Sequence, residues 1–234
     1  MTEERIGREY YDSSAYFDES SHLTDARSAF QRYRVANVLE IHRPDPGARV
    51  VDLGCGWGAF SFELAKQAAD VVGVDFSAKS IDLCHRRLVL DPRDNLRFLC
   101  ADAGDTDLEA GAWDLVVAAD LFEHLYPDDS RRVVAEAYRL LRPGGRFSVW
   151  TPHRGHVLEI LKNHDVLLSR DVSHVDYKSM ERMTGMMREA GFEIERAYYA
   201  ESHLPGLRTL ERLLQGLVPL LRRRIAVLGR KPGG

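Results

Sequence analysis

The segment from Arg49 to Gly58 constrains the fold of this chain more than any other. It reads RVVDLGCGWG, an apolar strand-like run that ends in an acid and a cluster of glycines. Residues 60–67, which follow, are typical of a helix. Glycine has no Cβ, so it can adopt positive φ and leave room for a bulky group against the backbone. The segment therefore predicts a strand–turn–helix unit whose turn approaches a ligand.

Two acids indicate what kind of ligand this is. Asp52 precedes the glycines, where a phosphate-binding turn has no use for a carboxylate because phosphate sits on backbone N–H groups. Asp75 ends the next apolar run, close to the spacing of about 20 residues at which an acid reaches a ribose diol. The pair favours a nucleotide-like ligand that carries positive charge or hydrogen-bond donors.

Strand-like and helix-like segments alternate along the chain. A helix is expected over 25–42, and two late strands over 192–199 and 225–229, preceded by a helix over 177–190. Between them we expect strands at 49–53, 71–75, 96–100, 113–119 and 145–150, and helices at 58–68, 78–89, 129–141 and 154–168. This alternation, with continuous apolar strands, predicts a parallel sheet with helices on both faces.

Four acids fall at or near the ends of predicted strands: Asp52, Asp75, Asp102 and Asp120. Parallel α/β sheets bind their ligands at the carboxyl ends of the strands, so these acids should meet at one edge. Bare carboxylates gathered there would repel one another unless a ligand supplied donors or positive charge.

The chain resembles the class I S-adenosylmethionine-dependent methyltransferases over roughly residues 45–155. The resemblance is carried by 51–58 (VDLGCGWG), 73–77 (GVDFS), 98–103 (FLCADA), 113–125 (WDLVVAADLFEHL) and 140–145 (LLRPGG). It implies an α/β, Rossmann-like, doubly wound sheet of seven strands in the order 3-2-1-4-5-7-6, with an antiparallel last strand. It also implies S-adenosylmethionine as cofactor and S-adenosylhomocysteine as product.

The same resemblance implies a set of cofactor-binding residues. Asp75 would hold the ribose hydroxyls, Asp102 the adenine amino group, and Arg34 the methionine carboxylate. The full set is Arg34, Asp52, Gly54, Cys55, Gly56, Asp75, Phe76, Asp102, Ala103, Asp120 and Leu121.

His124 is the candidate catalytic residue. It follows the fourth strand, where the methyl acceptor should lie, and a histidine suits proton removal from a hydroxyl or ammonium near neutral pH. A purely structural histidine is the alternative. Sulfonium chemistry needs little help beyond positioning the reactants in line.

The expected reaction is methyl transfer to an O or N atom of a small-molecule acceptor, without a metal. Two alternatives remain open. One is a metal-dependent O-methyltransferase for a quinone-like or RNA 3′-end acceptor, with Asp120, Glu123, His124 and His174 as ligands. The other is a catalytically silent cofactor-binding protein.

We expect residues 1–44 to form an N-terminal arm and helix, either a surface arm or a lid over the cofactor, and residues 45–234 to form the methyltransferase domain. Two inserts are expected. The first, about 153–176, lies on the acceptor side and contains four histidines, a set that suits an anionic acceptor or a merely polar surface. The second, about 202–224, is rich in leucine with a basic end. Its stretch 204–224 suits a core-packed helix pair, a dimer surface or a peripheral membrane contact.

Composition and sequence pattern argue against several classes of protein. The net charge of −4 argues against a surface built for nucleic acid, and the three cysteines show no CxxC pairing and are expected to be buried. The N-terminus does not resemble a signal peptide, and no run of about 18 apolar residues exists. A cytoplasmic protein, monomeric or homodimeric, is therefore expected.

Overall fold

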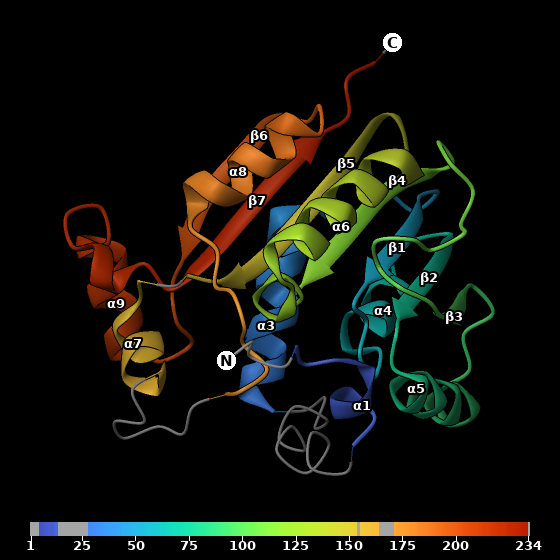
Figure 1. Ribbon diagram of the computed structural model, residues 1–234, viewed down its shortest axis with the longest axis horizontal. Coiled ribbons are helices and arrows are strands. Elements are labelled where there is room, and N and C mark those ends of the chain that lie inside the picture. Colours follow the sequence, from blue (N-terminus) through green and yellow to red (C-terminus); the bar gives the residue numbers. More distant parts are fainter. Residues whose placement is uncertain (1–4, 14–27, 154, 164–170, 234) are drawn as a thin grey trace.

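A mixed sheet organises the chain in the computed structural model (Figure 1). Its seven strands run in the order β3-β2-β1-β4-β5-β7-β6, which confirms the expected order. The strands are β1 Arg49–Leu53, β2 Asp70–Asp75, β3 Leu96–Cys100, β4 Trp113–Ala119, β5 Leu141–Pro152, β6 Glu193–Ala200 and β7 Arg224–Arg230. β7 pairs antiparallel with both β5 and β6, and the remaining pairs are parallel. The structure describes residues 5–13, 28–153, 155–163 and 171–233.

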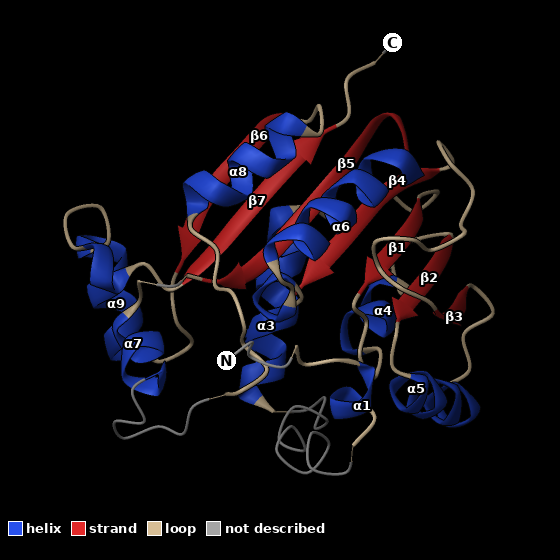
Figure 2. Cartoon of the chain, in the orientation of Figure 1, coloured by secondary structure: helices blue, strands red, loops and turns tan. Residues whose placement is uncertain are grey.

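Helices cover both faces of the sheet (Figure 2). On one face, Val133 of α6 (Pro127–Leu140) and Met183 of α8 (Met180–Glu189) share a buried cluster with Val116. On the other, α3 (Ala29–Ile41) and α4 (Ala59–Leu64) pack in a cluster that contains Val117. Because adjacent residues of a strand point to opposite faces, β4 contributes to both cores. α5 (Ala78–Leu90) flanks β3, and the Ser77 side chain caps it by accepting a hydrogen bond from the Ser80 N–H.

Several segments differ from expectation. α4 is shorter than 58–68, and β5 begins at Leu141 rather than at 145. Pro143, Gly144 and Gly145, just before the strand expected at 145–150, form an irregularity inside β5, where the pairing with β4 shifts and Gly144 has a φ of 81°. Cys100 is exposed, because β3 is an edge strand with a solvent-facing side, whereas Cys55 and Cys84 are buried.

The inserts are only partly helical. In the first, α7 spans Val157–Asn163, while 154 and 164–170 lie outside the described residues. A helix pair was one expectation for the second insert. The structure instead has one α-helix, α9 (Pro205–Leu214), and a 3₁₀ turn, η3 (Pro219–Leu221). No helix in the described ranges is long and apolar enough to cross a membrane.

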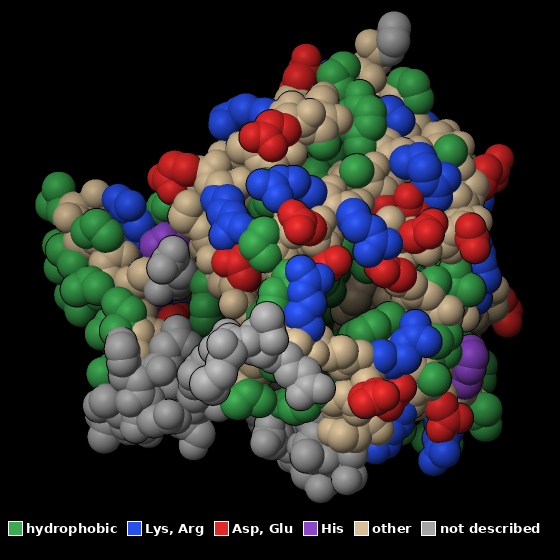
Figure 3. Space-filling model, viewed as in Figure 1, with side chains coloured by type: hydrophobic (Ala, Val, Ile, Leu, Met, Phe, Trp, Pro, Cys, Tyr) green, Lys and Arg blue, Asp and Glu red, His purple; other side chains and the backbone are tan. Residues whose placement is uncertain are grey.

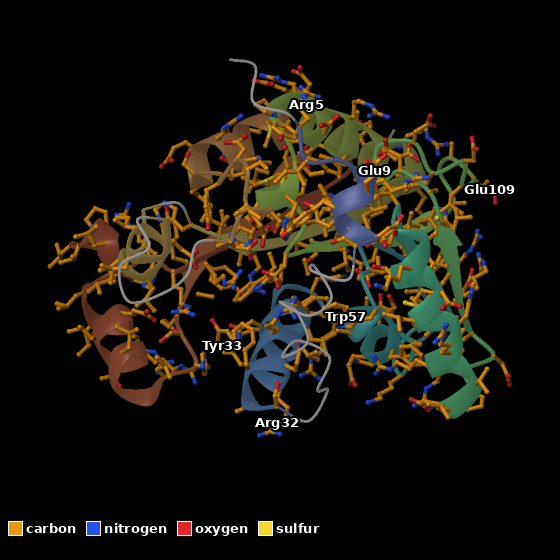
Figure 4. The ribbon with its side chains drawn as sticks, turned by 60° about the horizontal axis from the view of Figure 1, so that its bottom comes forward. Arg5, Glu9, Arg32, Tyr33, Trp57 and Glu109 are labelled. Atoms are coloured by element: carbon orange, nitrogen blue, oxygen red, sulfur yellow. The ribbon has the colours of Figure 1, made fainter. Side chains whose placement is uncertain are left out.

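The N-terminal arm contains one short helix, α1 (Arg8–Tyr11), and residues 14–27 lie outside the description. Figure 1 shows α1 beyond the ends of β1 and β2, and Figure 4 looks onto this edge with α1 marked by Glu9. The arm therefore lies at the carboxyl edge of the sheet, where the sequence predicts the ligand.

Candidate functional site

A cavity of about 250 Å³ opens at this carboxyl edge, between the glycine turn after β1, the end of β2 and the turn after β4. Most of the residues expected at the site line it: Gly54, Gly56, Asp75, Phe76, Asp102, Ala103, Asp120, Leu121 and His124. Arg34, Asp52 and Cys55 are not among its described lining residues. The convergence expected from the strand ends is therefore present for three of the four acids.

The glycine turn brings bare backbone to the cavity. Gly54 and Gly56 have φ values of 71° and 53°, which side chains rarely adopt. A Cβ on Gly54 would lie 2.7 Å from a Leu121 methyl carbon, whereas a Cβ on Gly56 would enter open space. The room above Gly56 is therefore room for a ligand.

Asp75 is held by the backbone around it. One carboxylate oxygen accepts from the Gly56 N–H at 2.9 Å, and the other accepts from the Ser77 N–H at 2.9 Å. Burial raises the pKa of this carboxyl, and the backbone hydrogen bonds oppose that rise. Asp75 thus braces the glycine turn while facing the cavity.

Asp102 lies at the more open end of the cavity. It accepts from the Gly104 N–H at 2.7 Å and pairs with the Arg132 guanidinium of α6 at 3.2 Å. Its side chain is about half exposed. Ala103 lines the cavity beside it.

Asp120 forms ion pairs with two arginines. Arg34 of α3 contacts one oxygen at 2.5 Å, and Arg224, the first residue of β7, contacts the other at 2.5 Å. Burial would raise the pKa of Asp120, but the two guanidinium groups outweigh it and lower the pKa to about 2. The φ of Asp120 is 52°, a strained value for a residue with a side chain. Arg34 therefore bonds an acid of the site rather than lining the cavity.

Asp52 lies under the glycine turn. It is 1% exposed, and one oxygen accepts from the Ser61 hydroxyl at 2.5 Å. The other oxygen, Oδ1, is buried without a hydrogen-bond partner among the described residues. Burial raises the pKa of Asp52 to about 7. Cys55 is also buried, next to Cys84 in a small cluster.

His124 sits in the 3₁₀ turn η2 (Phe122–His124) that follows β4. Its Nδ1 lies 3.1 Å from the Ser173 carbonyl oxygen. A carbonyl can only accept, so Nδ1 carries a proton and, in the neutral ring, Nε2 has the lone pair. The ring lies 4.9 Å from that of His174 and 6.0 Å from that of Tyr11.

Glu123, His124 and His174 offer ligand atoms that lie within 4.8 Å of one another. Three of the four residues expected in the metal alternative therefore come together, while Asp120 is held by its arginines. Burial, with Asp120 nearby, raises the pKa of Glu123 to about 8, so its carboxyl is mostly protonated at neutral pH.

The N-terminal arm closes one side of the cavity. The Tyr11 ring lies 5.1 Å from that of Phe76, and both residues line the cavity. Asp12 accepts from the Ser77 hydroxyl at 2.6 Å, while the Ile6 N–H donates to the Tyr126 hydroxyl at 3.1 Å. The arm is thus fastened to both sides of the cavity, at α5 and next to α6.

Several residues of this region were missed as site residues from the sequence, among them Tyr11, Lys178 and Arg224. Lys178 is fully buried, and its ammonium donates to the carbonyls of Phe122 and Leu125 at 2.8 and 2.9 Å. The position of Arg224 could have been predicted from the sequence. An antiparallel strand begins at the edge of the sheet where the parallel strands end, so the first residue of such a strand reaches the site.

The histidines of the first insert do not act as one group. His156 is fully buried and lies 3.2 Å from Glu211, and burial lowers its pKa to about 3. It is therefore neutral and cannot contact an acceptor. His174 lies beside His124, and His164 falls outside the described residues.

Comparison with known proteins gives a consistent result. A family model described as "Methyltransferase domain" matches residues 50–145. The chain is 28% identical over 204 residues to a demethylmenaquinone methyltransferase of Clavibacter sepedonicus, covering 76% of this chain and 81% of the relative. It is 41% identical over 137 residues to a magnesium-protoporphyrin O-methyltransferase of Rhodobacter capsulatus, covering 52% of this chain and 60% of that relative.

Among solved structures, a geranyl diphosphate C-methyltransferase from Streptomyces coelicolor A3(2) matches with a TM-score of 0.64 at 17% identity. The match covers 86% of this chain and 79% of that one, whose structure contains S-adenosyl-L-homocysteine. At this identity the likeness shows the fold alone.

Proposed function

We propose, because this chain belongs to the class I S-adenosylmethionine-dependent methyltransferases, that it moves a methyl group to an O or N atom of a small-molecule acceptor. One observation supports the proposal most: the glycine turn, Asp75 and His124 face a single cavity at the carboxyl edge of the sheet. Cofactor-binding groups and a basic nitrogen therefore share one space.

The residues present fit the cofactor. The open space above Gly56 accommodates a ligand against the backbone, and Asp75 and Asp102 offer carboxylate oxygens to its donors in the same cavity. We assign the ribose to Asp75, the adenine to Phe76 and Asp102, and the methionine part to the turn of Gly54 and Gly56. Bound S-adenosylmethionine supplies a methyl group on a sulfonium, which is a good leaving group.

His124 acts on the acceptor in this proposal. Its Nε2 would take the proton of an acceptor hydroxyl as that oxygen receives the methyl group. For an acceptor ammonium, Nε2 would remove a proton first, because the nitrogen needs a free lone pair to attack. The Ser173 carbonyl holds the tautomer that makes this possible. The arm with Tyr11 serves as a lid that excludes water from the cavity.

The acceptor class rests on the relatives. The two relatives are named for demethylmenaquinone and magnesium-protoporphyrin, which supports a small-molecule acceptor. The net charge of −4 gives no support to a nucleic-acid acceptor. A small, largely apolar acceptor is the proposal.

The test is the His124→Ala variant, with His85→Ala as control because His85 is an exposed histidine on α5, away from the cavity. His124→Ala should lower turnover about 10²–10⁴-fold and leave cofactor affinity nearly unchanged. Near-normal turnover would make His124 structural. If the parent binds S-adenosylmethionine but never forms S-adenosylhomocysteine with any acceptor, the protein is a silent cofactor binder.

A metal-dependent reaction is the second candidate, favoured by the grouping of Glu123, His124 and His174. Oxygen and imidazole ligands suit Mg²⁺, Mn²⁺ or a related ion. In that case chelation should abolish turnover and added Mn²⁺ should restore it. Full activity after chelation, with no metal by elemental analysis, would reject this candidate.

A further inference from the structure

The second insert presents leucines to solvent rather than to the core. Leu213 on α9 is 73% exposed, and Leu217 in the turn after it is 84% exposed. We call the exposed apolar residues of this insert the α9 surface: Leu204, Leu210, Leu213, Leu217, Val218 and Leu220. Figure 3 shows hydrophobic side chains gathered at the end of the molecule where Figure 1 places α9.

The inward side of α9 combines a buried acid, Glu211, with the half-buried Leu207 and Leu214 one turn before and after it. Glu211 is fully buried, lies 3.2 Å from the His156 ring nitrogen and accepts from the Ser202 N–H. A buried carboxylate with matched partners fixes the helix in its orientation. Leu213 and Leu217 therefore face outward, and packing against the described part of the protein does not explain them.

Arginines accompany the leucines. Arg208 and Arg212 line a hollow of about 440 Å³ with His203, Thr209 and Leu213, and none of these described lining residues is acidic. The side chains of both arginines are more than half exposed. The Glu201 carboxylate lies 3.8 Å from the Arg208 guanidinium and 3.6 Å from that of Arg212. One negative charge therefore faces two positive charges, and the pair of arginines keeps a net positive charge.

We propose that the α9 surface docks on an anionic phospholipid bilayer. The leucines enter the boundary between headgroups and acyl chains, while Arg208 and Arg212 contact lipid phosphates. The charge argues against a second copy of this chain, because a two-fold interface would bring the same arginines together from both sides. The proposal does not depend on the reaction of the cavity.

Vesicle co-sedimentation tests it with the full chain. The protein should bind vesicles of equal parts phosphatidylglycerol and phosphatidylcholine, and bind pure phosphatidylcholine at least about tenfold more weakly. The Leu213→Glu/Leu217→Glu variant should lose binding. The matched control is Val89→Glu/Leu90→Glu, since those residues of α5 are 79% and 86% exposed and the control adds the same charge. This control should bind like the parent.

The charge is tested separately. Arg208→Gln/Arg212→Gln should weaken binding roughly thirtyfold at low salt, at about 1 kcal/mol for each arginine. Should the double leucine variant fail to fold by circular dichroism, Leu217→Ser alone, in the turn outside the helix, replaces it. Equal binding to neutral vesicles, or no binding, would overturn the proposal. The proposal would also be overturned if light scattering showed that the parent is a dimer and that the leucine variant is a monomer.

Discussion

Three aspartates of the site have the same chemistry and different environments. Asp120 is ionised by its two arginines, Asp75 is braced by backbone N–H groups, and Asp52 is buried with one unpartnered oxygen among the described residues. The sequence could predict that acids at the ends of apolar runs meet, and Asp75 and Asp120 do line one cavity, whereas Asp52 is buried outside its described lining. The resemblance implied Arg34 as a ligand of the methionine carboxylate, but the pairing of Arg34 and Arg224 with Asp120 could not be predicted, because these residues are distant in sequence and meet only in the folded sheet.

Asp75→Ala should weaken binding of S-adenosylhomocysteine by about 1–3 kcal/mol, the cost of leaving donors without a buried acceptor. Isothermal titration calorimetry measures this. Asp82→Ala, an exposed position on α5, is the matched control and should bind like the parent. Unchanged affinity in Asp75→Ala, with the control also unchanged, would remove the ribose assignment.

The raised pKa of Asp52 predicts how the stability of the fold depends on pH. An unfolded aspartate titrates near pH 3.9, whereas the folded pKa of Asp52 is about 7. Between these values the folded state binds the extra proton, so Asp52 makes the free energy of unfolding fall as pH rises from about 4 to 7. Asp52→Asn removes this contribution.

Thermal unfolding of the ligand-free protein at several pH values measures the effect. The Asp52→Asn variant should lose less Tm than the parent between about pH 4.5 and 7. Asp82→Asn should follow the parent, because that exposed acid is away from the cavity. Parallel curves for Asp52→Asn and the parent would mean that Asp52 is ionised throughout this range.

At the scale of elements, the turn that carries His124 depends on a segment far along the chain. The Val175 and Asp176 N–H groups donate to the Glu123 carbonyl, and Lys178 bonds the carbonyls on either side of it. The strands and main helices could be predicted, since apolar periodicity is a local property. This clamp could not, because nothing local distinguishes Lys178 from a surface lysine.

Lys178→Met should destabilise the fold and loosen the turn. The change removes the ammonium donor of the Phe122 and Leu125 carbonyls, which keep longer bonds from the Leu125 N–H at 3.3 Å and the Ser130 hydroxyl at 3.4 Å. A hydrogen bond from a charged donor is worth about 1.5–3 kcal/mol. Urea unfolding should show this loss, and turnover should fall more than cofactor affinity because His124 loses its position. Lys66→Met is the control, since Lys66 is half exposed and bonds only Glu63 in the described structure. A variant as stable as the parent would show that the clamp is dispensable.

At the scale of the whole molecule, the arm joins the two halves of the cavity. Asp12 is bonded to Ser77 at the start of α5, and Arg5 pairs with Asp129 of α6 at 3.8 Å. None of the described hydrophobic clusters includes a residue of α1. The arm therefore adds little to the core and should act mainly on the closed, liganded state.

Tyr11→Ala tests this role. S-adenosylhomocysteine at about 100 times its Kd should stabilise the parent by about 2.7 kcal/mol, a rise in Tm of roughly 5–10 °C. Loss of the Tyr11 ring from the Phe76 side of the cavity should weaken binding about tenfold, which removes about 1.4 kcal/mol. At the same ligand concentration the shift in Tm should therefore fall to about half, while the ligand-free Tm changes little.

Glu9→Ala is the control within the same short helix, because Glu9 is exposed and should leave the shift intact. If both variants keep the full shift, the arm is a surface feature and not a lid. If Tyr11→Ala lowers the ligand-free Tm as much as the liganded one, the ring belongs to the core after all. A reduced shift at an unchanged ligand-free Tm means that the ring stabilises the ligand-bound cavity, the behaviour expected of a lid.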